Sequence, residues 1–338
     1  MQRVAIIGLG LIGGSIGMSL RRWSAANQNA LHITGFDEDM SKQSLAKKKG
    51  AVDSTEWALA NAVKEAQIVI VATPISAMER VFEDISPHLQ QGTVVTDTGS
   101  TKADVLKWAK KLPAGVSFVG GHPMAGKTGS LEEADADLFQ GATWVVCPAV
   151  DADEDSIKNV LGIISTTGAE SYFADPVEHD SFVAGISHLP FVVAASLVRS
   201  VVNDPAWRDM KSLASTGFRD TTRLALGNPV MHSSIATSNK EAINRWINQM
   251  IDGLQDFQER LNDPSEDCIV KVREFLEEAQ DARARVEVAV NRAAEQALAT
   301  QDTLSKESVS DQMGRMFLGG FGRRRRGSDK DDSTPRRR

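Results

Sequence analysis

The side chains best suited to proton transfer in this sequence lie on two loops built mainly from small residues. One loop is Gly120-Gly-His122-Pro-Met-Ala-Gly126, and the other is Asp97-Thr-Gly-Ser100-Thr-Lys102. A histidine imidazole exchanges a proton near neutral pH, and the small neighbours of His122 leave room for a ligand. His122 is therefore a candidate for proton transfer beside the serine loop. A purely structural hydrogen bond is its competing interpretation.

Two motifs in the second half of the chain carry groups that could contact a polar substrate. They are Ser187-His188-Leu-Pro190 and Gly217-Phe-Arg219-Asp-Thr-Thr-Arg223. Arg219 and Arg223 are four residues apart and would share one face of a helix. Two guanidinium groups facing a cleft suit a substrate with two carboxylates. We expect Arg223 to contact the ligand and Arg219 to pair with a neighbouring acid, whereas His188 could equally begin a helix with a local partner.

The first residues of the chain contain a glycine pattern typical of dinucleotide binding. The β-branched run Val4–Ile7 predicts a buried strand, and Gly8-Leu-Gly10-Leu-Ile-Gly13 leads from it into an apolar, helix-compatible segment. In this setting the first glycine permits a tight turn, the second lets backbone approach a pyrophosphate, and the third lets helix and strand pack closely. The phosphates would bind free N–H groups at the helix start. A flexible turn or a secretory signal would also be glycine-rich or apolar, but the segment has no convincing cleavage site.

An acidic residue after the next strand favours NAD as the cofactor. Leu31–Phe36 predicts that strand, and Asp37 follows it, roughly 20 residues past the glycine motif. Its carboxylate would accept hydrogen bonds from the adenosine ribose hydroxyls, and no arginine follows to pair with a 2′-phosphate, so NAD is favoured over NADP. The expected cofactor-binding residues are Gly8, Leu9, Gly10, Leu11, Ile12, Gly13, Asp37, Thr73, Pro74 and Thr98.

The order of these patterns predicts an α/β fold in which an N-terminal doubly wound Rossmann domain is followed by an all-helical domain. Strand and helix signals alternate to about residue 172, which implies a parallel sheet with right-handed crossovers. From Asp175 onward the pattern is helical, and the predicted helices are Pro176–Val202, Trp207–Leu226, Pro229–Ser238 and Lys240–Asn262.

We expect four regions along the chain. They are an NAD-binding Rossmann domain at 1–172, a helical substrate and dimerisation domain at 173–263, a long helical extension at 264–312 and a disordered basic tail at 313–338. Heptad spacing in the extension fits a helix lying along its own domain and a coiled-coil seam between subunits equally well. The heptad positions are Cys268, Val272, Phe275, Ala279, Ala282, Val286, Ala289 and Ala293.

The composition limits the class of protein and its partners. The chain has 338 residues, 41% of them hydrophobic, which is enough for two domains with real cores. We expect no apolar run long enough to span a membrane, and a net charge of −7 argues against general nucleic-acid binding. Cys147 and Cys268 are far apart without metal-type spacing, so we expect reduced thiols in a cytoplasmic protein with no metal site.

Together, five motifs resemble those of the prephenate and arogenate dehydrogenases of tyrosine biosynthesis. The resemblance covers residues 1 to about 262 and implies NAD-dependent oxidative decarboxylation of prephenate to 4-hydroxyphenylpyruvate. Arogenate, which would give tyrosine directly, is the alternative substrate, and the expected assembly is a homodimer formed through the helical domain. The motifs are Gly8–Gly13, Asp97–Lys102, His122–Gly126, Ser187–Pro190 and Phe218–Arg223.

The resemblance also implies roles for individual residues. His122 would accept the proton of the ring hydroxyl, and Ser100 would hydrogen-bond near the same oxygen. Arg223 would hold a substrate carboxylate and His188 would line the pocket beside the substrate side chain, with Arg219 and Lys127 as further contacts. The sequence departs from the family pattern in the shortened loop Lys127-Thr-Gly-Ser130 and at Phe191, where many relatives have a second histidine.

Two other classes of protein share part of this pattern. Dehydrogenases of the β-hydroxyacid and 6-phosphogluconate type combine a Rossmann domain with helices, but they use a lysine that follows a glycine on a helix of the second domain. His188 stands in that region, while Lys102 and Lys127 belong to the nucleotide domain. A non-catalytic NAD-sensing scaffold would bind NAD without turnover, and the presence of His122 and Arg223 argues against it.

Overall fold

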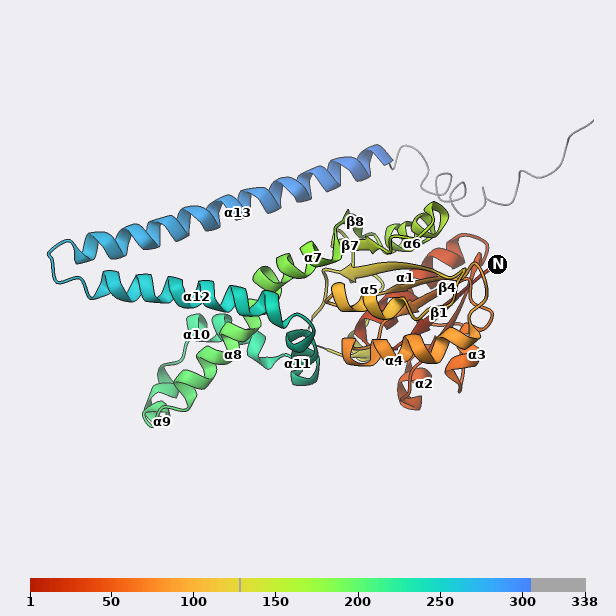
Figure 1. Cartoon of the computed structure of the whole chain (residues 1–338), viewed down its shortest axis with the longest axis horizontal. Coiled ribbons are helices and arrows are strands. Elements are labelled where there is room, and N and C mark those ends of the chain that lie inside the picture. Colours follow the sequence, from red (N-terminus) through yellow and green to blue (C-terminus); the bar gives the residue numbers. More distant parts are fainter. Residues whose placement is uncertain (128, 305–338) are drawn as a thin grey trace, which may run out of the picture.

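An eight-stranded sheet forms one end of the molecule (Figure 1) in the computed structural model, which describes residues 1–127 and 129–304. The strand order is β3-β2-β1-β4-β5-β6-β7-β8. Strands β2 and β3 are added on one side of β1, and β4 to β8 follow on the other side. This reversal of strand order defines a doubly wound Rossmann arrangement, so the predicted fold class is confirmed. The strands are β1 (Gln2–Ile7), β2 (Leu31–Phe36), β3 (Ser54–Thr55), β4 (Ile68–Val71), β5 (Val94–Asp97), β6 (Ser117–Pro123), β7 (Thr143–Pro148) and β8 (Glu170–Phe173).

Helices cover both faces of the sheet. Strand β4 shows how the two layers are separated, because Ile68 and Ile70 pack into one core and Val69 and Val71 into the other. All four residues are buried, as expected for a central parallel strand. One face carries α1 (Leu11–Ala26), α2 (Met40–Lys49) and α6 (Glu154–Thr166), and the other carries α3 (Leu59–Val63), α4 (Ile75–Ile85) and α5 (Ala103–Ala109).

Strand β7 departs from the parallel sheet that the sequence predicted. It pairs antiparallel with β6, with His122 opposite Val145, whereas the other strand pairs are parallel. A short 3₁₀ turn, Leu131–Glu133, lies between β6 and β7 in place of a crossover helix, so the returning strand runs in the opposite direction. The edge strand β8 gives no apolar signal in the sequence because all of its residues are exposed.

The second half of the chain is helical, as predicted. Asp175 caps the first helix by accepting hydrogen bonds from the backbone nitrogens of Val177 and Glu178, and Pro176 occupies the first turn. The helices are α7 (Pro176–Val183), a π-helical turn (Ala184–His188), α8 (Leu189–Val202), α9 (Trp207–Met210), α10 (Thr216–Thr222), α11 (Pro229–Ser238), α12 (Lys240–Leu261) and α13 (Cys268–Leu304). The first three of these form one continuous helix over the range that the sequence predicted.

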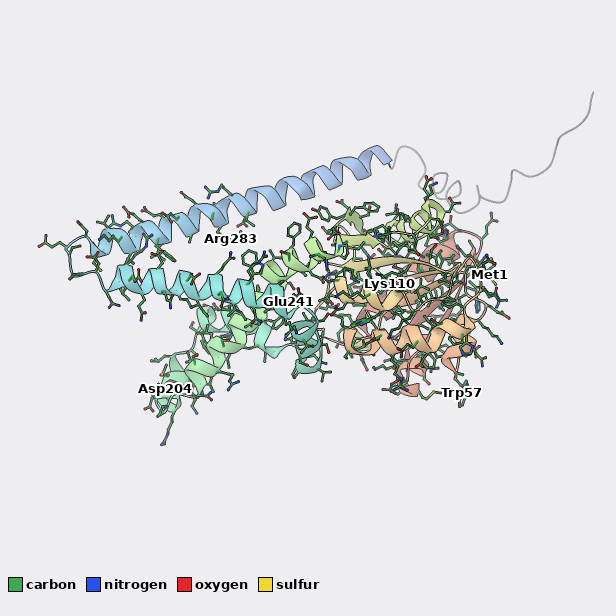
Figure 2. The ribbon with its side chains drawn as sticks, viewed as in Figure 1. Met1, Trp57, Lys110, Asp204, Glu241 and Arg283 are labelled. Atoms are coloured by element: carbon green, nitrogen blue, oxygen red, sulfur yellow. The ribbon has the colours of Figure 1, made fainter. Side chains whose placement is uncertain are left out.

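The single helix predicted over Trp207–Leu226 is wrong. Two 3₁₀ turns, Lys211–Leu213 and Arg223–Leu226, replace its middle and its end, and Ala214 is extended. The serine, threonine and glycine residues around this break have low helix propensity, which accounts for the interruption. Asp204, between α8 and α9, lies at the tip of this helical arm, far from Met1 and Trp57 in the sheet domain (Figure 2).

Helices α12 and α13 form an antiparallel hairpin (Figure 1). The ring of Phe275 packs edge-on against Phe257 with centroids 5.2 Å apart, so the start of α13 lies along its own domain. Further along the heptad pattern, Ala279, Ala282 and Val286 are exposed. The side chains of Ala289 and Ala293, and all of the predicted basic tail at 313–338, lie outside the described structure.

By length and composition, the continuous helix Pro176–Val202 is long and apolar enough to cross a membrane. The expectation that no apolar run is long enough to span a membrane is therefore wrong. Only 22% of its most apolar window is buried within the chain. However, the same helix carries His179, Asp180 and His188, which are buried against α5 and α12 in a polar network described below. Burial of these polar groups against protein indicates a helix of a folded domain.

Candidate active site

The glycine loop between β1 and α1 is shaped to receive a pyrophosphate. Gly8 has a φ of +96°, and a Cβ added to it would lie 2.6 Å from the carbonyl oxygen of Ala72. A Cβ on Gly13 would lie 2.0 Å from the Gly8 carbonyl oxygen, whereas a Cβ on Gly10 would have no atom within 4 Å. Packing therefore requires Gly8 and Gly13, and Gly10 faces open space at the start of α1. Leu9 is buried below this opening, and Leu11 and Ile12 are half-buried beside it.

Asp37 at the end of β2 fixes the glycine loop in place. Its Oδ2 accepts a hydrogen bond from the backbone nitrogen of Leu9 at 2.8 Å, and its Oδ1 accepts one from Asp39 at 2.9 Å. A carboxylate has about four acceptor positions, so capacity remains for ribose hydroxyls. The residues at this loop therefore fit NAD, and Asp37 has a structural task in addition to the predicted one.

The neighbouring strand ends supply the other expected cofactor residues. Pro74 is the N-cap residue of α4, and the backbone nitrogen of Thr98 donates to the carbonyl of Val71 at 3.1 Å. The buried hydroxyl oxygen of Thr73 has no hydrogen-bond partner among the described residues. A buried polar atom without a partner at a ligand-binding edge fits completion by a bound molecule.

A buried ion pair joins the two segments that the sequence singled out, although Gly120–Pro123, expected as a loop, belongs to strand β6. The ammonium of Lys102 bonds the carboxylate of Asp97, and both side chains have no exposed surface. Lys102 also donates to the carbonyl of Gly121 at 2.7 Å, and Asp97 accepts from the backbone nitrogens of Gly99 at 2.7 Å and Gly121 at 3.0 Å. The end of β5 and the end of β6, which carries His122, are thereby held together.

His122 belongs to a chain of buried hydrogen bonds. Its Nδ1 lies 2.9 Å from Nε2 of His179, and Nδ1 of His179 lies 2.8 Å from Oδ1 of Asp180. The two rings meet edge to face with centroids 5.1 Å apart. Asp180 also accepts hydrogen bonds from the backbone nitrogens of Lys102 and Ala103, at 2.7 and 2.9 Å. The helical domain therefore contacts the end of β6 and the start of α5 in the Rossmann domain through α7.

Burial keeps His122 neutral. It lowers the pKa of His122 well below the usual value, and electrostatic interactions with His179, Lys102 and His188 lower it further. A neutral imidazole has a ring nitrogen with a free lone pair, which is the form that accepts a proton.

His188 presents a third imidazole near this cluster. Its Nδ1 lies 3.2 Å from the side-chain nitrogen of Asn239, which also donates to the backbone carbonyl of Asp180 at 2.7 Å. Since an amide nitrogen only donates, Nδ1 of His188 is the acceptor and its Nε2 carries the proton. That Nε2 is buried and has no partner among the described residues. His188 therefore offers an unused hydrogen-bond donor, which is what a binding group requires.

A π-helical turn brings His188 to the same side as His179 and Asp180. An α-helix turns about 100° per residue, so nine positions would place His179 and His188 on roughly opposite faces. The backbone nitrogen of Leu189 bonds the carbonyl of Ala184, which adds one residue to that turn. Pro190 has no N–H to donate, so it cannot form the regular bond to Ile186 in the following turn.

The remaining predicted contacts are less closely connected to this cluster. Ser100 is half-buried in the loop between Asp97 and Lys102, and its hydroxyl has no hydrogen-bond partner among the described residues. Lys127, Arg219 and Arg223 are exposed. Arg219 lies in α10 and Arg223 in the following 3₁₀ turn, which packs against α8. The acid expected to pair with Arg219 is not found in the described structure.

The titration of His188 predicts an acid-sensitive fold. Burial lowers its pKa to about 4, so between pH 6.5 and 4 the folded state binds fewer protons than the unfolded state. The stability that the neutral His188 contributes is therefore complete at neutral pH and is lost as the pH falls from 6.5 to 4. The free energy of unfolding should drop by about 2–3 kcal/mol between pH 7 and pH 4.5 from His188 alone.

Denaturant unfolding of wild type and His188→Gln at both pH values measures this contribution. The variant should show a smaller loss of stability on acidification than the wild type. His88→Gln is the matched control, because His88 is exposed on the 3₁₀ turn after α4. An equal loss in wild type and His188→Gln would contradict the assignment.

The most important residues that the sequence did not identify are His179, Asp180 and Asn239. They belong to no motif with a chemical spacing, and His179 and Asp180 look like ordinary polar residues of a helix that begins at Pro176. Asp97 and Lys102 were visible in their motif, but nothing in the sequence indicated that they form a buried pair. No group of three or more histidine, cysteine or acidic residues suited to hold a metal occurs in the described part of the chain.

Comparison with known proteins identifies both halves of the chain. Residues 16–173 match the family model described as the prephenate dehydrogenase nucleotide-binding domain. Residues 175–278 match the model described as the prephenate dehydrogenase dimerization domain. The two matches meet between β8 and α7, where the sheet ends and the helices begin.

Individual relatives agree with these models. A prephenate dehydrogenase of Bacillus subtilis is 34% identical over 265 residues, which cover 76% of this chain and 70% of that protein. The structure of Aquifex aeolicus prephenate dehydrogenase in complex with hydroxyphenyl propionate and NAD+ matches with a TM-score of 0.77 and 28% identity, over 85% of this chain and 98% of the other. Synechocystis arogenate dehydrogenase matches with a TM-score of 0.71 and 28% identity, over 84% and 100%.

Proposed function

The chain belongs to the prephenate dehydrogenase family, and we propose that it catalyses the NAD-dependent oxidative decarboxylation of prephenate to 4-hydroxyphenylpyruvate. The observation that carries this proposal is the neutral His122 at the carboxyl edge of the sheet, with one ring nitrogen bonded to His179 and the other without a hydrogen-bond partner among the described residues. Purified protein supplied with NAD and prephenate tests it, through the absorbance of reduced nicotinamide.

The reaction needs a base more than it needs electrophilic assistance. The ring carbon that bears the hydroxyl loses a hydride, the hydroxyl loses a proton, and the ring carboxylate leaves as carbon dioxide while the ring becomes aromatic. Bound NAD would accept the hydride. His122 takes the hydroxyl proton, and Ser100 hydrogen-bonds near the same oxygen. A positioned proton acceptor of this kind typically accelerates a reaction by about 10²–10⁴-fold.

The surroundings of His188 favour prephenate over arogenate. The two substrates differ in their side chain, which carries a keto group in prephenate and an ammonium in arogenate. The Nε2–H of His188 can donate to a keto oxygen, but it opposes an ammonium, which is also a donor. The acid near His188 is Asp180, whose carboxylate already accepts from two backbone nitrogens and from His179. No free carboxylate among the described contacts of His188 is left to pair with an ammonium.

Arg223 is the proposed partner of a substrate carboxylate. Replacing it with glutamine should raise the KM for prephenate by roughly 10–100-fold, because a charge-assisted hydrogen bond contributes about 1.5–3 kcal/mol. Steady-state kinetics with varied prephenate measures the change. Arg208→Gln, which alters an exposed arginine of α9, is the control and should leave KM within about twofold. An unchanged KM in Arg223→Gln would remove Arg223 from the site, whereas Arg219 and Lys127 remain candidates for the same role.

A homodimer through the helical domain is the proposed assembly. The matched dimerization domain begins at residue 175, and exposed apolar side chains follow along the first long helix. The exposed residues include Val177, Phe182 and Ile186. A second copy of the chain would cover this surface and remove it from water.

We also propose a cytoplasmic location. The free thiols Cys147 and Cys268 are consistent with it, since a reducing compartment keeps thiols unpaired.

A further inference from the structure

Two buried side chains beyond the family motifs connect His122 to the helical domain. His179 is 2% exposed and Asp180 is 5% exposed, and both lie on the second turn of α7. Their hydrogen bonds run in one line from Asp180 through His179 to His122. These hydrogen bonds reach His122 at Nδ1, whereas the substrate would contact the other ring nitrogen, Nε2. Substrate contact therefore does not explain why His179 and Asp180 are buried here.

Each hydrogen bond in the line has a fixed direction. An ionised carboxylate only accepts, so Nδ1 of His179 carries a proton and donates to Asp180. A neutral imidazole has one donor and one acceptor, so Nε2 of His179 is an acceptor. Nδ1 of His122 must then donate to it at 2.9 Å, which leaves the lone pair of His122 on Nε2.

Asp180 is held firmly enough to impose this direction. Its two oxygens accept from the backbone nitrogens of Lys102 and Ala103 at the start of α5, at 2.7 and 2.9 Å. These donors cannot be reversed, so both oxygens must remain acceptors.

We propose that His179 and Asp180 are positioning residues that set the tautomer of His122, so that Nε2 faces the substrate as a base. This role rests on the proposed function of His122. When His122 takes the hydroxyl proton on Nε2, it becomes an imidazolium whose Nδ1–H still donates to His179. His179 in turn remains hydrogen-bonded to the negative charge of Asp180. The pair thus orients the base and also stabilises the charge that it acquires, in a water-excluded position where such interactions are strong.

The variants His179→Gln and His179→Leu separate positioning from packing. The glutamine amide oxygen can accept the Nδ1 proton of His122, and the leucine side chain can accept nothing. We expect His179→Gln to retain kcat within about tenfold and His179→Leu to lose about 10²-fold or more, with NAD affinity unchanged in both. Equal kcat in the two variants would overturn the proposal.

Nitrogen-15 NMR of histidine-labelled protein without substrate reads the tautomer directly. The signals of His122 are assigned by comparison with His122→Asn, and the wild type should show a protonated Nδ1 and an unprotonated Nε2. Asp180→Ala should remove this preference, because Nδ1 of His179 then has no carboxylate to donate to and either tautomer of His179 can form. A wild-type His122 protonated on Nε2 contradicts the proposal even if Asp180→Ala fails to fold. Since this measurement needs no turnover, its failure is distinct from failure of the proposed enzyme activity.

Discussion

Replacing His122 with asparagine is expected to lower kcat by about 10²–10⁴-fold while leaving NAD binding intact. The asparagine amide has no group that takes a full proton near neutral pH, so the ring hydroxyl must release its proton to water. The cofactor loop at Gly8–Gly13 is a separate part of the sheet edge and should be unaffected. The measurement is steady-state turnover with prephenate, together with the Kd for NAD from titration calorimetry.

Two outcomes would contradict this account of His122. Unchanged kcat would show that another group takes the proton. Weak NAD binding in the variant would make His122 a structural residue of the cofactor site instead of a base. His88→Gln, on the exposed 3₁₀ turn after α4, is the matched control and should change neither quantity.

The second large effect is expected from two alanine substitutions in the glycine loop that act in opposite ways. Gly13→Ala places a Cβ 2.0 Å from the carbonyl oxygen of Gly8, a clash with backbone that only a shift of α1 against β1 can relieve. We expect it to lower the free energy of unfolding by about 3 kcal/mol. Gly10→Ala meets no atom within 4 Å, so the fold should tolerate it, but the added methyl occupies the approach of the pyrophosphate.

Denaturant unfolding and NAD titration on the same two proteins distinguish these effects. Gly10→Ala should unfold like the wild type and bind NAD at least about tenfold more weakly, a change of about 1.4 kcal/mol. Gly13→Ala should be less stable before any ligand is added. Normal NAD affinity in Gly10→Ala would mean that the phosphates do not lie at the start of α1.

Much of the fold and the cofactor site could be predicted because local sequence determines them. A β-branched run followed by Gly8, Gly10 and Gly13 has few structural solutions, and the distances around those glycines show why. Asp37 was placed by its distance along the chain from the motif. The glycines are neighbours in sequence, and Asp37 lies beside them because β2 pairs directly with β1.

The parts that sequence reasoning missed depend on long-range geometry. The direction of β7 depends on how the preceding loop returns to the sheet edge, and the residues of the strand itself do not determine it. His179 and His188 share a side of their helix because of a single π turn, which helical periodicity cannot anticipate. The line from Asp180 to His122 spans two domains, so its residues are far apart in the sequence.

The arginine motif and the long apolar helix show a different limit. Spacing alone placed Arg219 and Arg223 on one helix, but the helix ends between them. The helix Pro176–Val202 has the length and composition of a membrane span, yet its polar residues are part of a buried network. The composition of this helix does not show whether a membrane or a second subunit would bury its exposed apolar side chains.

The most direct test of the proposed activity is turnover of purified protein with NAD and either prephenate or arogenate, offered separately at matched concentrations. The formation of reduced nicotinamide gives kcat/KM for each substrate, and the release of carbon dioxide confirms the decarboxylation. The donor on His188 and the absence of a free carboxylate among its described contacts predict clear reduction with prephenate and a kcat/KM at least about tenfold lower with arogenate. Preference for arogenate would contradict the assignment of the side-chain site, and no reduction of NAD with either substrate would contradict the proposed function as a whole.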